Sequence, residues 1–201
     1  MSISLAKGQK VSLVKLDNGV STGLSRIYVG CGWDEAPARK GLFGIPKNGE
    51  SIDVDASVIL LRNGRFVDKN DLVYYGNKNH NSGAVNHHGD NLTGEGDGDD
   101  EVISIDLNSV PNDVDRIIIV ANIYNAEKKK QDFGLIQNAF IRIVDETTNI
   151  EFCKYDMSNE FAGYTALVFG ELYRHNGEWK FNAIGSGTHD GSLSELARKY
   201  A

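Results

Sequence analysis

The chain has 201 residues, of which 40% are hydrophobic, and it carries a formal net charge of −7. This apolar content is enough for a packed core, which excludes an intrinsically disordered protein. The acidic balance excludes a general attraction for phosphate backbones, so we expect no nucleic-acid partner. The longest apolar runs, Val58–Leu61 and Ile117–Ala121, are far shorter than the ~20 residues that a membrane-spanning helix needs.

The first residues, MSISLAKGQKV, contain no continuous apolar stretch of the kind found in secretory signals, which favours a cytoplasmic location. The two cysteines, Cys31 and Cys153, are far apart in the sequence and have no CxxC spacing. We therefore expect two buried thiols in a reducing compartment, and no redox or metal-binding pair.

Most of the chain has the pattern of short strands separated by turn signals, which is typical of a β-sandwich or a β-barrel. Val102–Leu107 alternates apolar and polar residues, whereas Arg116–Tyr124 is a continuous apolar run, as in a central strand that is covered on both faces. The predicted strands, in chain order, are Val11–Leu16, Arg26–Cys31, Ile52–Leu61, Asp71–Tyr75, Val102–Leu107, Arg116–Tyr124, Ala139–Val144, Ile150–Tyr155, Tyr164–Tyr173 and Trp179–Ile184.

Turn and helix signals complete the expected secondary structure. The pairs Asn63-Gly64 and Asn176-Gly177 lie between apolar segments and predict type I′ turns, because both residue types tolerate positive φ. Ser192–Glu195 has the S-x-x-E pattern of a capping box and predicts a short C-terminal helix. A short helical turn is also expected at Asn108–Val114. No Pro- or Ser-rich linker divides the chain, so we expect a single domain over residues 1–201.

The strongest functional signal is Gly89–Glu101, with the sequence GDNLTGEGDGDDE, which we call the acidic segment. Most acidic runs are solvated loops, but here the crowded carboxylates adjoin a predicted strand, and interleaved glycines let the backbone wind tightly. Oxygen ligands without His or Cys favour Ca²⁺ or Mg²⁺, and a flexible glycine-rich chain favours calcium. The side chains that carry oxygen within the segment are Asp90, Asn91, Thr93, Glu95, Asp97, Asp99, Asp100 and Glu101.

A second group of carboxylates lies upstream. Asp53 and Asp55 project from one face of a predicted strand, in line with the hydroxyl group of Ser57. Asp34 ends an earlier strand and is placed to reach the same end of a sandwich. The nine carboxylates of the two groups exceed the charge of one Ca²⁺ ion, so we expect two ions.

The segments CGWD, DVDAS, HHGDNLTGEGDGDDE, FGELYRHNGEWKF and AIGSG together resemble the TerD (tellurium-resistance) family over nearly the whole chain. The resemblance implies an all-β fold, a β-sandwich of two mainly antiparallel sheets, with a bacterial stress-response role that includes tellurite resistance. It also implies calcium binding by the acidic segment together with DVDAS. The ligands carried over by position are Asp53, Asp55, Asp90, Asn91, Glu95, Asp97, Asp99, Asp100 and Glu101, with Asp34 as a further candidate. Glu35–Glu50 departs from the family pattern and looks enlarged.

The leading interpretation is a non-enzymatic, calcium-dependent scaffold or sensor, with calcium and other stress-response proteins as its partners. An alternative is a calcium-dependent membrane-docking module with peripheral membrane association, for which Leu92 and Glu35–Glu50 are the candidate contact residues. A metal-dependent hydrolase is a third interpretation and requires an open coordination position and a general base. No GxSxG motif nominates a catalytic serine, so we expect no catalytic residues.

Histidines and a glycine-rich stretch give weaker signals. In a strand, His87 and His88 point to opposite faces, and we expect a polar lining of the mouth of the acidic site in preference to transition-metal ligation by one of them. His80 has no partner that the sequence reveals. Gly185–Thr188 is interpreted as a plain turn, or else as a backbone nest for an anion.

Overall fold

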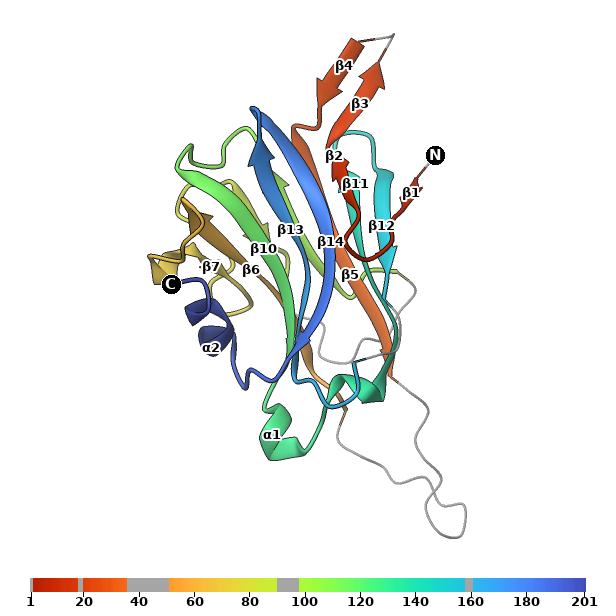
Figure 1. Ribbon diagram of the computed structural model, residues 1–201, viewed down its shortest axis with the longest axis vertical. Helices are drawn as coiled ribbons and strands as arrows, with labels where there is room; N and C mark the ends of the chain where they lie inside the picture. Colours follow the sequence, from red (N-terminus) through yellow and green to blue (C-terminus); the bar gives the residue numbers. More distant parts are fainter. Residues whose placement is uncertain (1, 18–19, 36–50, 90–97, 158–160) are drawn as a thin grey trace.

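The computed structural model describes residues 2–17, 20–35, 51–89, 98–157 and 161–201. Their strands form two six-stranded sheets that pack face to face, which confirms the predicted β-sandwich (Figure 1). Sheet A has the order β1 (Ile3–Ser4), β12 (Ile150–Asp156), β11 (Ile136–Asp145), β5 (Arg26–Glu35), β9 (Glu101–Asp106) and β8 (Val85–His87). Sheet B has the order β2 (Lys10–Ser12), β14 (Glu178–Thr188), β13 (Ala166–His175), β10 (Val114–Ile123), β6 (Val54–Arg62) and β7 (Leu72–Val73).

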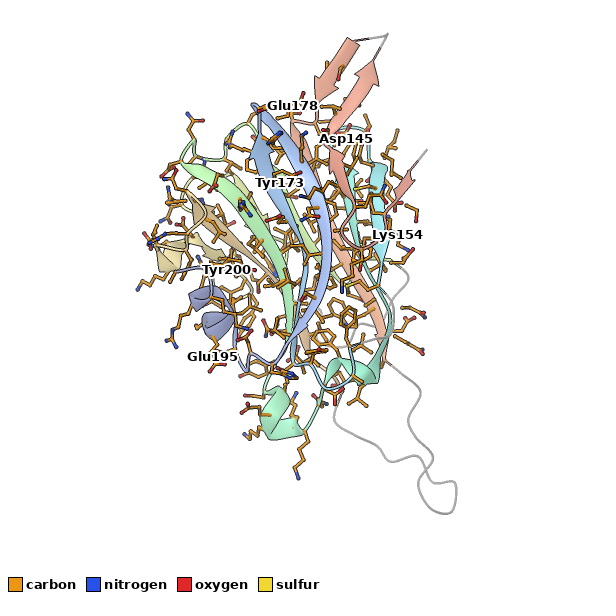
Figure 2. The ribbon with its side chains drawn as sticks, in the orientation of Figure 1. Asp145, Lys154, Tyr173, Glu178, Glu195 and Tyr200 are labelled. Atoms are coloured by element: carbon orange, nitrogen blue, oxygen red, sulfur yellow. The ribbon has the colours of Figure 1, made fainter. Side chains whose placement is uncertain are left out.

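The pairings in these sheets are antiparallel except for that of β1 with β12. A separate two-stranded hairpin, β3 (Val14–Asp17) and β4 (Val20–Gly23), projects from one end of the sandwich (Figure 1). An ion pair of 2.8 Å between Lys15 Nζ and Asp145 Oδ2 ties this hairpin to the end of β11. Asp145 is labelled in Figure 2.

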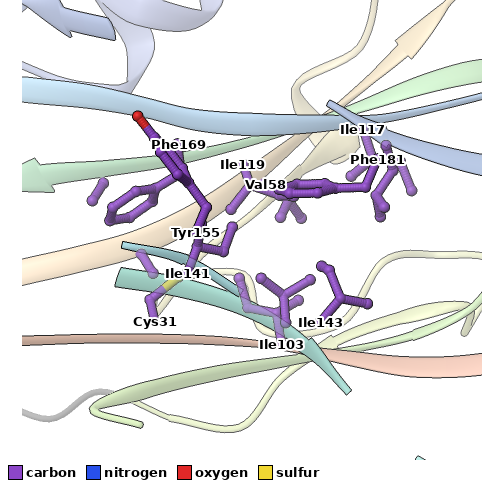
Figure 3. Packing of buried hydrophobic residues seen from close by; sticks show 14 of the residues in the cluster. Cys31, Val58, Ile103, Ile117, Ile119, Ile141, Ile143, Tyr155, Phe169 and Phe181 are labelled. Carbon is purple, nitrogen blue, oxygen red and sulfur yellow. The ribbon is translucent and has the colours of Figure 1, made fainter. Parts of the chain in front are cut away.

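The core lies between the inner faces of the two sheets. Val58, Ile117 and Ile119 of sheet B approach Ile103 and Ile143 of sheet A, and all five are fully buried or nearly so (Figure 3). Burial of each such side chain stabilises the fold by about 1.5–3 kcal/mol. This packing explains why alternate residues of the predicted strands are apolar.

Sheet B is also covered on its outer face. Ile59 of β6 and Ile118 of β10 form a second cluster with Leu196 of helix α2 (Leu193–Arg198). β10 is therefore buried on both faces, as its continuous apolar run predicts. Within the described residues, no helix is long and apolar enough to cross a membrane.

Local turn and cap signals are confirmed. Asn63 and Asn176 have φ of 51° and 54°, and the glycines that follow them also have positive φ, as type I′ turns require. Ser192 caps α2, because its Oγ accepts a hydrogen bond of 3.3 Å from Glu195 N. Glu195 Oε2 in turn accepts one of 2.9 Å from Gly191 N.

Other expectations are wrong or incomplete. Asn108–Val114 forms turns in place of a helix, because Asp106 accepts hydrogen bonds from Asn108 N and Ser109 Oγ and so satisfies groups that a helix would use. Gly185–Thr188 is part of β14, so it is neither a turn nor an anion nest. The predicted strand Val11–Leu16 is divided at Leu13, between β2 and β3. The predictions also missed β1, β4, β8 and the short helix α1 (Ala126–Lys129).

Candidate metal site

The described end of the acidic segment lies against β5 of sheet A. Cys31 and Trp33 of β5 face the core. Asp100 binds this strand at two points, since its N donates to Cys31 O (2.8 Å) and its Oδ2 accepts from Trp33 N (2.8 Å). The backbone of β5 therefore holds the point at which the acidic segment joins β9.

Two glycines of β5 make room for this contact. A Cβ on Gly30 would overlap the carboxyl group of Asp99. A Cβ on Gly32 would overlap the ring of Phe140 and lie 2.8 Å from Gly98 O. The glycines beside Cys31 are therefore needed for the close approach of the acidic segment, a role that the sequence analysis missed.

Asp99 has a positively charged partner that the sequence analysis also missed. Arg142 of β11 donates from Nε to Asp99 Oδ1 (2.7 Å) and from Nη2 to Asp99 Oδ2 (2.9 Å). The hydrogen bonds that Arg142 donates to Asp99 are the main cause that raises the pKa of Arg142. Because both carboxylate oxygens of Asp99 accept hydrogen bonds from the Arg142 guanidinium, the negative charge of Asp99 is balanced by a residue of the same chain.

Asp100 and Asp34 form the part of the site where negative charge accumulates. Burial raises the pKa of Asp100; the hydrogen bond from Trp33 N lowers it, and the nearby charges of Asp34 and Asp99 raise it further. Asp34 lies near the end of β5 and accepts a hydrogen bond of 2.7 Å from Asn138 Nδ2. Because the charge of Asp34 disfavours the ionised form of Asp100, a cation bound nearby would stabilise it.

Glu101 connects the acidic segment to sheet B. Its side chain is 1% exposed, and its Oε2 lies 3.1 Å from His87 Nε2. The same His87 nitrogen donates to Ala56 O (3.1 Å), while Nδ1 accepts from Gly89 N (3.1 Å). His87 therefore bridges the start of β9 to β6, next to Asp55.

Asp53 and Asp55 lie at this same corner. Ile52 N donates to Glu35 Oε1 (2.7 Å), which joins the end of β5 to the start of β6. Asp53 is partly buried, and its carbonyl oxygen accepts from Tyr124 N (2.8 Å). Asp55 is 4% exposed. The structure thus brings β6 next to the anchored end of the acidic segment, through the contact of His87 with Ala56 O, while Asp55, like Ser57, lines a pocket on the face of β6 opposite to Val54 and Val58.

The other expected ligands, Asp90, Asn91, Glu95 and Asp97, lie outside the described residues, as do Leu92 and residues 36–50. Among the residues that the structure describes, no three His, Cys, Asp or Glu side chains form a group able to hold a metal ion. Calcium takes six to eight oxygen ligands. The carboxylates near β5, β6 and β9 therefore supply only part of a coordination shell.

Both cysteines are buried, as expected. Burial raises the pKa of Cys31 well above its usual range, and the negative charges of Asp99, Glu101 and Asp100 raise it further. Burial likewise raises the pKa of Cys153 to about 12. Both thiols are therefore neutral and shielded, which makes them poor nucleophiles.

The histidines differ from expectation in one respect. His87 is buried, whereas the ring of His88 lies on the other face and contacts Ser104 Oγ at 2.7 Å, so the two point apart as predicted. The partners of His80 were missed: its Nε2 lies 3.0 Å from Asp71 Oδ1, and its Nδ1 lies 2.7 Å from Ser82 Oγ.

This Ser82–His80–Asp71 chain is a structural network. Arg62 donates to both carboxylate oxygens of Asp71, at 2.8 and 2.9 Å, so Asp71 forms a bidentate ion pair with Arg62. Ser82 Oγ accepts a hydrogen bond of 3.1 Å from Ala84 N, so the hydroxyl group stabilises the local turn that contains Ser82. The network therefore secures the segment between β7 and β8.

Comparison with known proteins agrees with this architecture. The TerD domain model matches residues 1–200 of the chain. The chain is 48% identical to stress response protein SCP2 of Bacillus subtilis (strain 168), with 100% of both proteins covered. It is 42% identical to tellurium resistance protein TerD of Serratia marcescens, with 100% of this chain and 97% of that protein covered.

A solved structure shows the same fold. The crystal structure of a homologue of telluride resistance protein (TerD) from Streptomyces coelicolor A3(2) superposes with a TM-score of 0.66 at 21% identity, over 87% of this chain and 96% of that one. The match over residues 1–200 and the identity to whole-length relatives lead to one conclusion: this chain belongs to the TerD family.

Proposed function

We propose that the chain binds calcium through the acidic segment and acts as a non-enzymatic, calcium-dependent scaffold or sensor in bacterial stress response. The observation that carries the proposal is the position of Asp100 and Asp34 beside each other, at the point where the acidic segment is fixed to β5. Relatives named for stress response and tellurium resistance support the biological setting.

The residues present fit a hard cation. The donors at this corner are carboxylate oxygens, which calcium prefers, and both cysteines are buried in the core. Because Arg142 occupies both oxygens of Asp99, we assign Asp99 to anchoring the segment in the metal-free state. The proposed ligands are Asp34, Asp53, Asp55, Asp90, Asn91, Glu95, Asp97, Asp100 and Glu101, which supply enough charge for two ions.

The anchored arrangement suggests how calcium would alter the molecule. Glu101 is fixed through His87, and Asp100 is fixed through the backbone of β5, so the C-terminal end of the segment is already in place. Calcium would remove the repulsion between the carboxylates and join the acidic segment to β6. The result would be a surface with a defined shape and charge, which a partner protein could recognise.

Calorimetric titration of Ca²⁺ and of Mg²⁺ into demetallated protein tests this proposal. Wild type should bind about two calcium ions, with clear preference over magnesium. Asp97→Asn combined with Asp100→Asn should weaken calcium binding at least about tenfold, since each change removes charge but keeps the shape of the side chain. Glu178→Gln, an exposed change in the β13–β14 hairpin, is the matched control. Equal calcium affinity in wild type and the double variant would refute the proposed location.

A further inference from the structure

A pocket of about 290 Å³ lies beside the outer face of sheet B, next to α2. Its lining includes Asp55 and Ser57 of β6, Tyr74 and Tyr75 after β7, and Tyr124 after β10. The start of α2, from Gly191 to Ser194, completes one wall. The volume is near the lower end of the range for small-molecule pockets, about 300 Å³.

The side of the pocket formed by β6 is polar and buried. Val58 of β6 faces the core, so Ser57 beside it faces the opposite way, toward the pocket. Ser57 is 1% exposed, and within the described part of the chain its Oγ has no hydrogen-bond partner. A buried hydroxyl group without a partner costs free energy. A ligand that supplies a hydrogen bond to Ser57 removes this cost.

The other walls are aromatic. The rings of Tyr74 and Tyr75 meet edge to face with centroids 5.4 Å apart, and those of Tyr75 and Tyr124 meet in the same way at 6.5 Å. Because neighbouring rings are nearly perpendicular to each other, the three tyrosines form a corner of the pocket and not a flat wall. Tyr75 and Tyr124 remain 41% and 44% exposed, so a ligand can reach both rings.

The charge of the pocket selects the kind of ligand. Asp55 is a charged residue of the described lining, which contains no lysine or arginine. The faces of aromatic rings attract cations, and ammonium groups with alkyl substituents suit such corners because they also bury apolar surface. Lys129 already shows this preference, with its Nζ 6.0 Å from the centre of the Tyr124 ring. An anionic ligand would instead be repelled by Asp55.

We propose that this pocket binds a small alkylated ammonium compound that also carries a hydroxyl group. The ammonium group lies against the tyrosine rings and faces Asp55, and the hydroxyl group pairs with Ser57 Oγ. The pocket shares Asp55 with the proposed calcium ligands, whereas Tyr75, Tyr124 and Ser57 are not among them, so the pocket can be tested in the absence of calcium.

Choline is the probe, and calorimetric titration with excess chelator is the measurement. Its neutral isostere, 3,3-dimethylbutan-1-ol, is the matched ligand control and should bind at least about tenfold more weakly, because it has the same shape but no charge. Tyr75→Leu and Tyr124→Leu should each weaken choline binding about fivefold, and Tyr173→Leu, outside the pocket on sheet B, should leave it unchanged.

Repeating the titration with saturating calcium separates this inference from the proposed function. If the protein binds choline but does not bind calcium, the choline pocket would be supported and the proposed calcium function would not. Weaker choline binding in calcium would support both, because an ion on Asp55 would reduce the charge that faces the pocket. Equal binding of choline and its neutral isostere would overturn the inference. So would full choline affinity in a folded Tyr75→Leu, Tyr124→Leu double variant, or the absence of choline binding to wild type.

Discussion

Arg142 and Asp99 form a bidentate ion pair across the surface of sheet A, with N–O distances of 2.7 and 2.9 Å. The pair joins β11 to the acidic segment, two parts of the chain that are 43 residues apart in sequence. It places one permanent positive charge beside a segment that is otherwise strongly negative. Arg142 is therefore the internal counter-ion that holds the segment in the absence of metal.

Replacing Arg142 with alanine should destabilise the calcium-free protein by about 1.5–3 kcal/mol, the usual contribution of hydrogen bonds between charged groups. Urea unfolding in the presence of chelator measures this loss. Arg26→Ala is the control, since the side chain of Arg26 is 60% exposed and its Nε lies 3.3 Å from Glu146 Oε2. Its cost should stay below about 1 kcal/mol. Equal costs for the two variants would show that Arg142 has no special anchoring role.

Gly30→Ala should destabilise the protein by about 1–3 kcal/mol, because the added methyl group meets the carboxyl group of Asp99. The loss should be smaller in an Asp99→Ala background, where the collision is removed, and a double-mutant cycle of unfolding free energies measures the difference. Gly23→Ala is the control, because the nearest atom to its new methyl group is 4.0 Å away. Strict additivity of the Gly30 and Asp99 changes would contradict the proposed contact.

Asp145 should make stability depend on pH in the acidic range. Burial raises its pKa, but hydrogen bonds from Lys15 and Thr147 outweigh this effect and lower the pKa to about 2. Since the folded pKa lies below the unfolded value of about 3.9, the stabilisation is complete above pH 5 and is lost as the pH falls toward 2. It amounts to about 2 kcal/mol.

Unfolding of wild type and Asp145→Asn between pH 6 and pH 2.5 measures this dependence. The stability difference between the two proteins should shrink steadily as the pH falls below about 4. A difference that stays constant over this range would mean that Asp145 titrates normally in the folded protein.

Calcium should stabilise the fold by mass action. At a free calcium concentration of a hundred times the dissociation constant, each site adds about 2.7 kcal/mol. For a chain of this size, this corresponds to a rise in melting temperature of roughly 5–10 °C per site. Asp34→Asn with Asp100→Asn should reduce the rise, and should stabilise the chelated protein slightly because it removes like-charge repulsion. An identical melting temperature in chelator and in millimolar calcium would contradict the proposal.

The sequence predicted those parts of the fold that have local causes. Alternating apolar residues predicted the positions of most strands. The pair Asn176-Gly177 predicted a turn with positive φ, and the spacing of Ser192 to Glu195 predicted the helix cap. Each of these signals depends on residues that are neighbours in the chain. Strand ends were less accurate: β5 continues to Glu35, four residues beyond the predicted end at Cys31, because pairing with β11 extends it.

Contacts between distant segments could not be read in this way. Arg142 is a single basic residue in an apolar strand, and nothing beside it indicates that Asp99 is its partner. The glycines around Cys31 likewise show no local reason for their presence until the acidic segment is placed above them. His87 shows the same limit: its alternation with His88 was predictable, but its link between Glu101 and Ala56 depends on how the two sheets meet.

A crystal structure of the protein grown with calcium tests the central claim most directly. Our account predicts ions at the corner of β5, β6 and β9, with oxygen atoms of Asp53, Asp55 and Asp100 at the ~2.3–2.6 Å distances of calcium coordination. Residues 90–97 should supply the remaining ligands, and Arg142 should remain near Asp99. Calcium bound elsewhere, or no bound calcium at millimolar concentration, would contradict the account. Ions held by residues 90–101 alone, with Asp53 and Asp55 outside the coordination distance, would contradict the joining of the acidic segment to β6.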